Sequence, residues 1–445
     1  MHRIISLTAA MALALWLGIG SVRGAVLPAK QRMLVVISLD GFPAYALEDP
    51  KLPVPHLRQL IETGASASRM LPVNPTVTWP NHTTMVTGVL PPQHGLFYNG
   101  TAVRTGGWPP VKIDYSIEKT KMVHAVTVYD LAQQAGLTTA QMDWVAINNA
   151  PTITWDFPER ATSQDPLVRE MIQRKILTAS DVDQPPKATI LWRDQIWTRA
   201  AEYVIREHKP NLLLLHLLTL DSTQHTYGPK TLAAYDGIAF LDSCVGRVLD
   251  AIRESGLEKR ATVIIVSDHG FKQFHKQIRP ALALAAAGLS QRVFVIPEGG
   301  SAMVYVDKSA TTEIVPRVRK MFEGTEGIAR VAGRAEFPSL GMPDPAKDPQ
   351  APDIVLYAKD DYAFSNPPAD GSGPVVITRD TAAGAHGYLN TDPDMNAIFI
   401  SSGYNIRHTF LGDIKNLQVA PVLAGLLQVH LPQASSPIPR GLFVQ

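Results

Sequence analysis

Six aspartate and histidine side chains flank apolar stretches of this sequence in a pattern that could bind metal. Three aspartates stand at the ends of apolar stretches, two histidines follow such an aspartate within four residues, and a third histidine precedes another apolar stretch in the segment G-A-H-G-Y. They are Asp40, Asp221, Asp268, His225, His269 and His386. Imidazole and carboxylate ligands without a thiolate suit zinc, and suit manganese or iron less well. Six ligands suffice for two three-ligand sites with open positions, which is the composition of a two-metal centre for phosphoryl transfer.

Each of these residues, taken alone, has an ordinary structural interpretation. An aspartate after a strand is usually a helix cap or a turn residue, and a single histidine is usually a hydrogen-bonded core or surface residue. The joint pattern favours a site, because three separate strand ends carry aspartate and three of the segments carry histidine. His216 lies inside an apolar stretch without a partner motif, and we interpret it as an ordinary structural histidine.

A candidate nucleophile, Thr78, lies in the segment 74–99, downstream of the first apolar stretch. Pro80 fits the first position of a helix and Gly88 fits the residue that ends one, so the sequence predicts a short helix over 80–87. A hydroxyl just before that helix would face free N–H groups and the positive end of the helix, which favour an alkoxide and a bound phosphate. The alternative is a simple threonine cap.

Alternating strands and helices must position these side chains. The stretches 33–39, 211–220 and 261–267 are short and apolar and each leads into an aspartate, as expected of buried parallel strands. Apolar residues recur at helical spacing over 194–207 and 235–255. The sequence therefore predicts an α/β fold with a mostly parallel central sheet and helices on both faces. In such sheets ligands bind beyond the carboxyl ends of the strands.

Residues 1–24 have the pattern of a secretory signal, with a short basic start followed by an apolar run. Their apolar run is shorter than the roughly 20 residues of a membrane-spanning helix, so we expect cleavage after Gly24 or Ala25. The mature protein is then expected to be exported, periplasmic or secreted, and to have no stable membrane anchor. Residues 25–445 would form the catalytic domain, with 275–380 as an inserted α+β cap subdomain.

Charge and cysteine content exclude other classes of protein. The chain has 445 residues, with 41 Lys and Arg against 40 Asp and Glu, which is a formal charge of +1. This balance argues against recognition of a nucleic-acid polymer, which needs a basic surface. The single cysteine, Cys244, excludes an internal disulfide framework and a cysteine-rich zinc site.

Four motifs, in order along the chain, carry a family resemblance. The first is T-W-P-N-H-x-T-x-V-T-G, followed by P-x-x-H-G and an asparagine; the others are D-S-T-Q-H-x-Y-G-P, S-D-H-G-F, and G-x-H-G-Y with a following N-x-x-P-x-M. This set resembles the nucleotide pyrophosphatase/phosphodiesterase branch of the alkaline phosphatase superfamily. The resemblance covers most of residues 33–100, 190–275 and 380–405, and it implies an alkaline-phosphatase-like α/β sandwich.

The resemblance also implies roles for particular residues. It implies two zinc ions per chain, with Thr78 at the metals as the nucleophile that forms a phosphothreonine intermediate. Asn99 matches the position that donates a hydrogen bond to a non-bridging phosphate oxygen. Trp79 matches an aromatic, usually phenylalanine in the family, that packs against the leaving or base group. The implied ligands are Asp221, His225 and His386 for one zinc, and Asp40, Asp268 and His269 for the other.

The substrate implied by this resemblance is a small, probably nucleotide-like phosphodiester or pyrophosphate. A phosphonate (phosphonoacetate-like) or phosphomonoester hydrolase would use the same six ligands, and a non-catalytic metal- or ligand-binding relative is the alternative from a different class. Trp79, and with it Trp144 or Trp155, favours the diester by offering an apolar wall. Cys244 lies in D-S-C-V-G on an expected helix, which does not match the modifiable residue of sulfatases.

Overall fold

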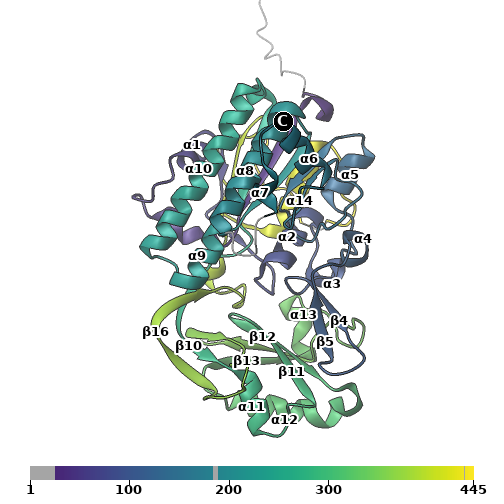
Figure 1. Ribbon diagram of the computed structural model, residues 1–445, viewed down its shortest axis with the longest axis vertical. Helices are drawn as coiled ribbons and strands as arrows, with labels where there is room; N and C mark the ends of the chain where they lie inside the picture. The colour runs from purple at the N-terminus through teal and green to yellow at the C-terminus, as the bar shows by residue number, and fades with distance from the viewer. Residues whose placement is uncertain (1–25, 184–188, 435, 445) are drawn as a thin grey trace, which may run out of the picture.

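The computed structural model describes residues 26–183, 189–434 and 436–444 (Figure 1). The secretory signal expected over residues 1–24 and its cleavage position lie outside the described residues. Among the helices of the described residues, none is long and apolar enough to cross a membrane.

An eight-stranded sheet forms the centre of the molecule, as the alternating pattern predicts. Its order is β18-β2-β17-β9-β1-β8-β6-β7, with β1 pairing in parallel with both β8 and β9. Strands β6 and β7 continue the parallel part on one side, whereas β17 pairs antiparallel with β9. The bounds are β1 Met33–Leu39, β2 Ala65–Ser66, β6 Thr139–Met142, β7 Trp155–Phe157, β8 Leu212–Leu217, β9 Ala261–Val266, β17 Phe399–Gly403 and β18 Thr409–Phe410. The predicted mostly parallel sheet is confirmed.

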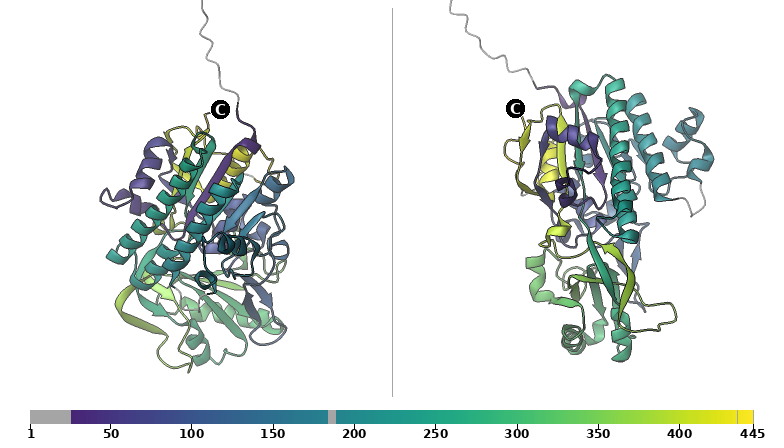
Figure 2. Two further views of the ribbon diagram at one scale, coloured as in Figure 1. Left: turned by 45° about the horizontal axis from the view of Figure 1, so that its top comes forward. Right: turned by 90° about the vertical axis from the view of Figure 1, so that its left-hand side faces the viewer.

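Helices cover both faces of this sheet because successive side chains of a strand point to opposite sides. In β1, Val35 and Ile37 pack into the core formed with α1, α8 and α10, while Leu34 and Val36 pack toward α2, α5 and α14. In the right-hand view of Figure 2, long teal helices lie on one side of the sheet and the yellow helix lies on the other. The bounds are α1 Pro55–Thr63, α2 Thr78–Thr87, α5 Val128–Gln134, α8 Ile190–Glu207, α10 Leu232–Glu254 and α14 Val419–Leu427.

The strand expected over 211–220 is shorter in the structure, where β8 ends at Leu217. Helix α9, Thr219–Tyr227, begins before Asp221 is reached. The cause is a buried carboxylate from α8, Asp194, which accepts hydrogen bonds from the backbone N–H groups of Leu218 (3.0 Å) and Thr219 (2.8 Å). These N–H groups therefore turn away from the sheet, and Asp221 lies in the first turn of a helix instead of directly after a strand.

The helix expected over 80–87 also begins two residues earlier, so Thr78 is its first residue. Pro80 occupies the third position instead of the first. A proline is tolerated there because the first four N–H groups of a helix have no partner within it. Gly88 ends the helix in the left-handed conformation (φ 69°), as expected of a residue without a side chain.

A second sheet lies at the lower end of the molecule in Figure 1. It is antiparallel, in the order β11-β12-β14-β13, and α11 and α12 cover one of its faces. A three-stranded sheet, β15-β10-β16, connects it to the central sheet. The bounds are β10 Lys272–Ile278, β11 Val293–Glu298, β12 Ser301–Val306, β13 Ile328–Gly333, β14 Ile354–Ala358, β15 Asp361–Phe364, β16 Val376–Ala385, α11 Pro280–Ala286 and α12 Thr311–Glu323.

Shorter elements complete the described chain. The hairpin β4–β5 and helix α13 share a hydrophobic cluster with the other face of the second sheet. Strands β3 and β19 form a two-stranded parallel pair beside the central sheet. The bounds are β3 Arg69–Leu71, β4 Thr101–Arg104, β5 Val111–Asp114, β19 Asp413–Lys415, α3 Pro91–His94, α4 Lys119–Met122, α6 Pro166–Gln173, α7 Ala179–Val182 and α13 Phe337–Leu340.

Candidate metal centre and nucleophile

The six side chains singled out in the sequence converge beyond the carboxyl ends of β1, β8 and β9. Their ligand atoms form two overlapping groups, and within each group these atoms all lie within 4.8 Å of one another. The groups are Asp221 with His225 and His386, and Asp40 with Asp221 and His269. Asp268 adjoins the second group, with its Oδ2 3.1 Å from His269 Nε2. Asp221 thus lies with both groups, whereas the resemblance assigned it to one.

The backbone around the cluster explains why glycines flank His386. Gly387 has a φ of 87°, and a Cβ there would lie 2.0 Å from the backbone oxygen of Glu298. A Cβ on Gly384 would lie 2.5 Å from the backbone oxygen of Gln224, on the helix that carries Asp221 and His225. Only residues without a side chain let the strand end approach α9 so closely. Close approach in turn places His386 against the other two residues of its group.

All three imidazoles of the cluster are oriented in the same way by backbone carbonyl groups. Their Nδ1 atoms face carbonyl oxygens, of Gly384 for His225 (3.2 Å), Gly270 for His269 (3.1 Å) and Thr76 for His386 (3.1 Å). A carbonyl oxygen only accepts, so the proton lies on each Nδ1 and the Nε2 lone pair faces the carboxylates. Such a second partner is the usual accompaniment of metal-binding histidines.

Several buried atoms of the cluster have no hydrogen-bond partner among the described residues. A buried polar atom without a partner costs about 1–3 kcal/mol, so such atoms are rare and informative. Within this cluster they are Asp40 Oδ1, Asp221 Oδ1, Asp268 Oδ2 and His269 Nε2. All four can donate an electron pair and none is placed to share a proton with a protein donor. The residues present therefore fit a pair of divalent metal ions.

Without a bound cation, burial and the neighbouring charges shift the pKa values of the cluster residues in different directions. Burial raises the pKa of Asp40 well above its ordinary range, and repulsion from Asp268 and Asp221 raises it further. Burial would also raise the pKa of Asp221, but the nearby histidines, led by His225, outweigh it and hold that pKa low. Burial lowers the pKa of His386 well below its usual value, with His269 adding to the effect. A neutral imidazole beside carboxylates is the form that binds metal.

Thr78 stands beside this cluster at the start of α2. Its backbone oxygen lies 2.9 Å from His82 Nδ1, and that same nitrogen is 3.7 Å from Asp268 Oδ2. Two residues upstream, the carbonyl oxygen of Thr76 contacts His386 as described above. The N-terminus of α2 is thus held against both candidate ligand groups. Its Val77 N–H donates to the Pro75 carbonyl oxygen and its Trp79 N–H donates to Asn99, so the Thr78 N–H is the donor left for an anion there.

Asn99 lies across from the start of α2. Its Oδ1 accepts a hydrogen bond of 2.9 Å from the backbone N–H of Trp79. Because the carbonyl end of the side chain is used in this way, its NH₂ group is free to point elsewhere as a donor.

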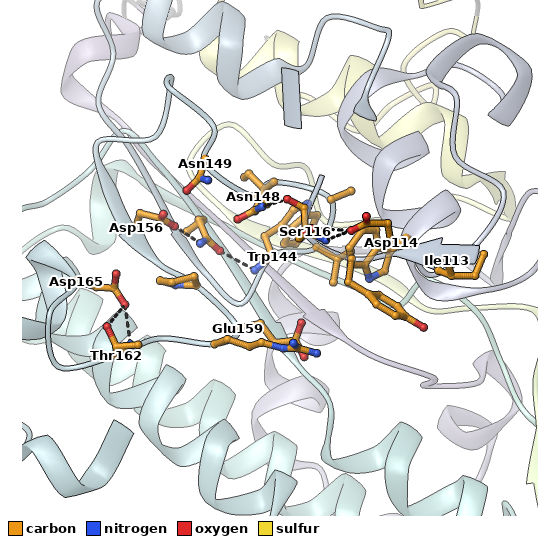
Figure 3. A pocket seen from close by; sticks show the side chains of 18 of the residues that line it. Ile113, Asp114, Ser116, Trp144, Asn148, Asn149, Asp156, Glu159, Thr162 and Asp165 are labelled. Carbon is orange, nitrogen blue, oxygen red and sulfur yellow. Dashed lines mark hydrogen bonds between the residues drawn. The ribbon is translucent and has the colours of Figure 1, made fainter. Parts of the chain in front are cut away.

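Trp79, the residue after Thr78, lines a cavity of about 660 Å³. Figure 3 shows this cavity, with Trp144, Ser116 and Asp114 among its labelled residues. Tyr115 meets the Trp79 ring edge to face, with ring centroids 6.2 Å apart, and Trp144 lines another side. Trp155 is not part of this wall, since it stacks on His208 at a centroid distance of 4.6 Å. The volume and the mixture of aromatic and polar groups suit a small organic ligand.

One contact of the cluster was not expected from the sequence. His216, which we interpreted as an ordinary structural histidine, places its Nε2 2.7 Å from Asp40 Oδ2. The only signal in the sequence is a polar residue in an apolar run, on the same side of β8 as Leu212 and Leu214. That pattern marks a buried polar contact but does not identify the partner.

The fold and the cluster together define a class of protein, an alkaline-phosphatase-like α/β protein with a candidate metal centre at the ends of its strands. Within that class, the sequence model of the type I phosphodiesterase/nucleotide pyrophosphatase family matches residues 34–389, and the chain belongs to this family. The resemblance noted from the motifs is thereby confirmed.

Individual relatives share about a quarter of their residues or fewer with this chain. Ectonucleotide pyrophosphatase/phosphodiesterase family member 3 of Bos taurus is 22% identical over 89% of this chain, which spans only 42% of that protein. Family member 7 of Mus musculus is 25% identical over 85% of this chain and 79% of its own length. Murine ectonucleotide pyrophosphatase/phosphodiesterase 5 is a structural neighbour, with a TM-score of 0.70, 19% identity, and coverage of 92% of this chain and 97% of that one. This likeness confirms the alkaline-phosphatase-like fold.

Proposed function

We propose that this protein is a two-zinc phosphodiesterase/nucleotide pyrophosphatase that uses Thr78 as its nucleophile. The observation that carries this proposal is the convergence of unpartnered carboxylate and imidazole atoms beside the N-terminus of α2. Asp221, His225 and His386 would hold one zinc, and the other would be held by the remaining ligands, Asp40, Asp268 and His269. When bound, the two zinc ions would lower the pKa of the Thr78 hydroxyl and neutralise the phosphoryl oxygens.

The chain's own groups perform the remaining work. Thr78 Oγ1 attacks phosphorus and the bond to the leaving alcohol or phosphate oxygen breaks, which leaves the phosphoryl group esterified to the threonine. A water molecule then attacks the same phosphorus, breaks the bond to Thr78 and releases the monoester. The backbone N–H of Thr78 and the NH₂ group of Asn99 donate to the non-bridging oxygens as negative charge builds on them.

The cavity supports a substrate with a second organic substituent. Trp79, the residue after the proposed nucleophile, lines this cavity together with Tyr115 and Trp144. In a diester one organic group can stay against this aromatic surface while the other group leaves. Murine ectonucleotide pyrophosphatase/phosphodiesterase 5, a structural neighbour, is described in an inactive threonine-to-alanine form in complex with AMP, which agrees with a nucleotide as the group that stays bound. We therefore propose a small nucleotide-like diester or pyrophosphate as the substrate, and no recognition of a nucleic-acid polymer.

Two further parts of the proposal concern the chain as a whole. We propose that the protein is exported, to a periplasm or beyond, because of the signal pattern over residues 1–24. We also propose that residues 25–445 act as one catalytic domain in which 275–380 form a cap. A hydrophobic cluster built only from residues of the second sheet, its helices and the adjoining strands supports that division.

A substrate panel with zinc tests this function. Purified protein would be assayed on bis-p-nitrophenyl phosphate, p-nitrophenyl phosphate and a phosphonate, together with Thr78→Ala. We expect the diester to be the best substrate and Thr78→Ala to lose at least about 10³-fold in kcat, as for other removed nucleophiles. Thr87→Ala is the matched control, since the Thr87 hydroxyl bonds only within α2, to the Thr83 carbonyl oxygen (2.7 Å).

Each alternative has its own outcome in this assay. Faster turnover of the monoester or the phosphonate would assign the protein to that class of hydrolase. Diester turnover that survives Thr78→Ala would exclude Thr78 as the nucleophile. Zinc binding without turnover of any substrate would indicate a non-catalytic relative, and full activity with manganese alone would correct the metal.

A further inference from the structure

His216 lies fully buried between two aspartates that are far apart in the sequence. Its Nε2 is 2.7 Å from Asp40 Oδ2, and its Nδ1 is 3.0 Å from the backbone oxygen of Asp143 and 3.2 Å from Asp143 Oδ2. None of the three side chains exposes more than 1% of its surface. The result is a continuous line of polar contacts from Asp143, directly after β6, through His216 on β8 to the candidate metal ligand Asp40, directly after β1.

The partners of the ring determine where its protons lie. The carbonyl oxygen of Asp143 can only accept, so Nδ1 carries a proton. An Asp40 carboxylate that holds a metal through one oxygen can only accept through the other, so Nε2 carries a proton as well. His216 therefore donates at both ends, and the donation at Nε2 is directed to a single oxygen of Asp40.

Packing against neighbouring rings holds the His216 ring in this position. It meets the His82 ring at a centroid distance of 4.5 Å, and His82 in turn meets Trp144 at 4.9 Å. Asp143 adopts the left-handed backbone conformation (φ 57°), and its N–H donates to the carbonyl oxygen of Phe157 on β7. A non-glycine residue keeps that conformation only where its surroundings hold it.

We propose that His216 is a positioning residue for Asp40, supported from behind by Asp143. By occupying Asp40 Oδ2, it leaves Asp40 Oδ1, which has no hydrogen-bond partner among the described residues, to face His269 Nε2 at 3.6 Å. The inference rests on the proposed function, because it takes Asp40 as a ligand of one of the two zinc ions. His216 and Asp143, which lie outside the four family motifs, would then support the metal site of that proposed function. Trp144, the neighbour of Asp143, also lines the cavity, so one short segment supports both the metal site and the substrate wall.

Zinc affinity measured by competition with a chromophoric chelator tests the proposal without any assay of activity. The variants are His216→Gln and His216→Asn, which carry the same amide but differ by one methylene group. The longer glutamine side chain can bring its NH₂ group to the position of Nε2, whereas asparagine reaches only the position of Nδ1. We expect His216→Asn to weaken one of the two zinc equivalents about 10–100-fold, the usual effect of losing such a support, and His216→Gln to restore most of it.

The control is His94→Gln, at another buried histidine, whose Nε2 contacts Thr84 Oγ1 at 3.1 Å and which is not a ligand. It should leave both zinc equivalents unchanged. Unchanged affinity in His216→Asn, or equal losses at both equivalents in both His216 variants, would overturn the positioning role. A wild-type protein that binds fewer than two zinc ions would instead refute the proposed function. If His216→Asn does not fold by circular dichroism, His216→Gln is compared with wild type, and a loss of either zinc equivalent there would overturn the role.

Discussion

Asn99 illustrates how one amide can serve both the helix and the substrate. The backbone N–H of Trp79, in the first turn of α2, has no partner within the helix and donates instead to Asn99 Oδ1 at 2.9 Å. That bond fixes which end of the amide faces the helix. The opposite end can then donate to a phosphoryl oxygen, which is the role that the family resemblance implied for this residue.

Replacing Asn99 by aspartate should separate these two roles. In Asn99→Asp the bond from Trp79 is retained, but the donor becomes a second carboxylate oxygen that repels the phosphate. We expect kcat/KM for the diester to fall about 10²–10³-fold, as for other lost oxyanion donors, with the thermal unfolding midpoint near that of the wild type. Steady-state kinetics and a thermal melt measure the two effects. An Asn99→Asp enzyme with normal kcat/KM would remove this residue from the mechanism.

At the scale of elements, the approach of α2 to the metal centre depends on a buried asparagine. Asn81 Nδ2 donates to the carbonyl oxygens of Pro75 (3.0 Å) and Val77 (2.9 Å), and its Oδ1 accepts from the N–H of Val73 (2.8 Å). A further donor, Asn416 Nδ2, reaches Oδ1 from the segment before α14 at 2.7 Å. The Asn81 side chain thus fixes the conformation of the loop 73–77, which leads into Thr78.

Asn81→Ala should therefore damage both stability and catalysis. It leaves several buried backbone groups without partners, at about 1–3 kcal/mol each in isolation, and we expect a net loss of about 2–4 kcal/mol in the free energy of unfolding. Because the loop also sets the position of Thr78, kcat should fall in the fraction that remains folded. Urea unfolding and active-site-normalised kinetics check this, with Thr87→Ala on the same helix as the control. A loss of stability with unchanged kcat would show that the loop does not position the nucleophile.

The start of α9 depends in a similar way on Asp194, and here pH is the test. Burial raises the pKa of Asp194 from 3.8 to about 6, despite the hydrogen bonds from Leu218 and Thr219. The folded protein therefore holds this proton more tightly than the unfolded chain, so stability falls as pH rises from about 4 to about 6. In Asp194→Asn, this decrease in stability between about pH 4 and about pH 6 should be absent. Urea unfolding at several pH values in the presence of a chelator measures it, and parallel pH profiles for the two proteins would contradict it.

At the scale of the whole molecule, the candidate metal centre joins segments that lie as far apart in the sequence as Asp40 and His386. These segments come from strand ends of the central sheet, from helix α9 and from the end of β16, which belongs to the three-stranded sheet next to the second sheet. Without cations, burial raises the pKa of Asp40 there, and repulsion from Asp268 and Asp221 raises it further. Bound metal should therefore stabilise the overall fold as well as serve the chemistry.

Metal removal should consequently lower the thermal unfolding midpoint. A site filled at 1,000 times its Kd adds about 4 kcal/mol to the free energy of unfolding, so a chelator should shift the melt clearly downward and added zinc should restore it. Differential scanning calorimetry with and without EDTA measures the shift. His225→Ala, which removes one ligand whose ring is partly exposed, should reduce the zinc-dependent part of the shift. Identical melts with and without EDTA would mean that the protein binds no stabilising metal.

Local patterns in the sequence were sufficient for much of the fold. The run 33–39 is a buried central strand, and Asp40 follows it directly, because a continuous apolar run bounded by a polar residue is a local property. The prediction was wrong at the end of β8 and at the start of α2. At the end of β8 a side chain from another element, Asp194, bonds to the backbone and changes where the strand ends. At the start of α2 the Trp79 N–H donates to Asn99, a contact between residues 20 apart that a local pattern does not show.

The sequence by itself determined the family, through its ordered motifs, and predicted which residues could do chemistry: the candidate ligands and a hydroxyl at the start of a helix. These depend on the identity and spacing of nearby residues, so they can be recognised without coordinates. Only the tertiary structure decided that Asp221 lies with both ligand groups and that His216 joins Asp143 to Asp40. Those contacts join positions far apart in the chain, and only the packing of the strands and helices against one another brings them within a few ångströms.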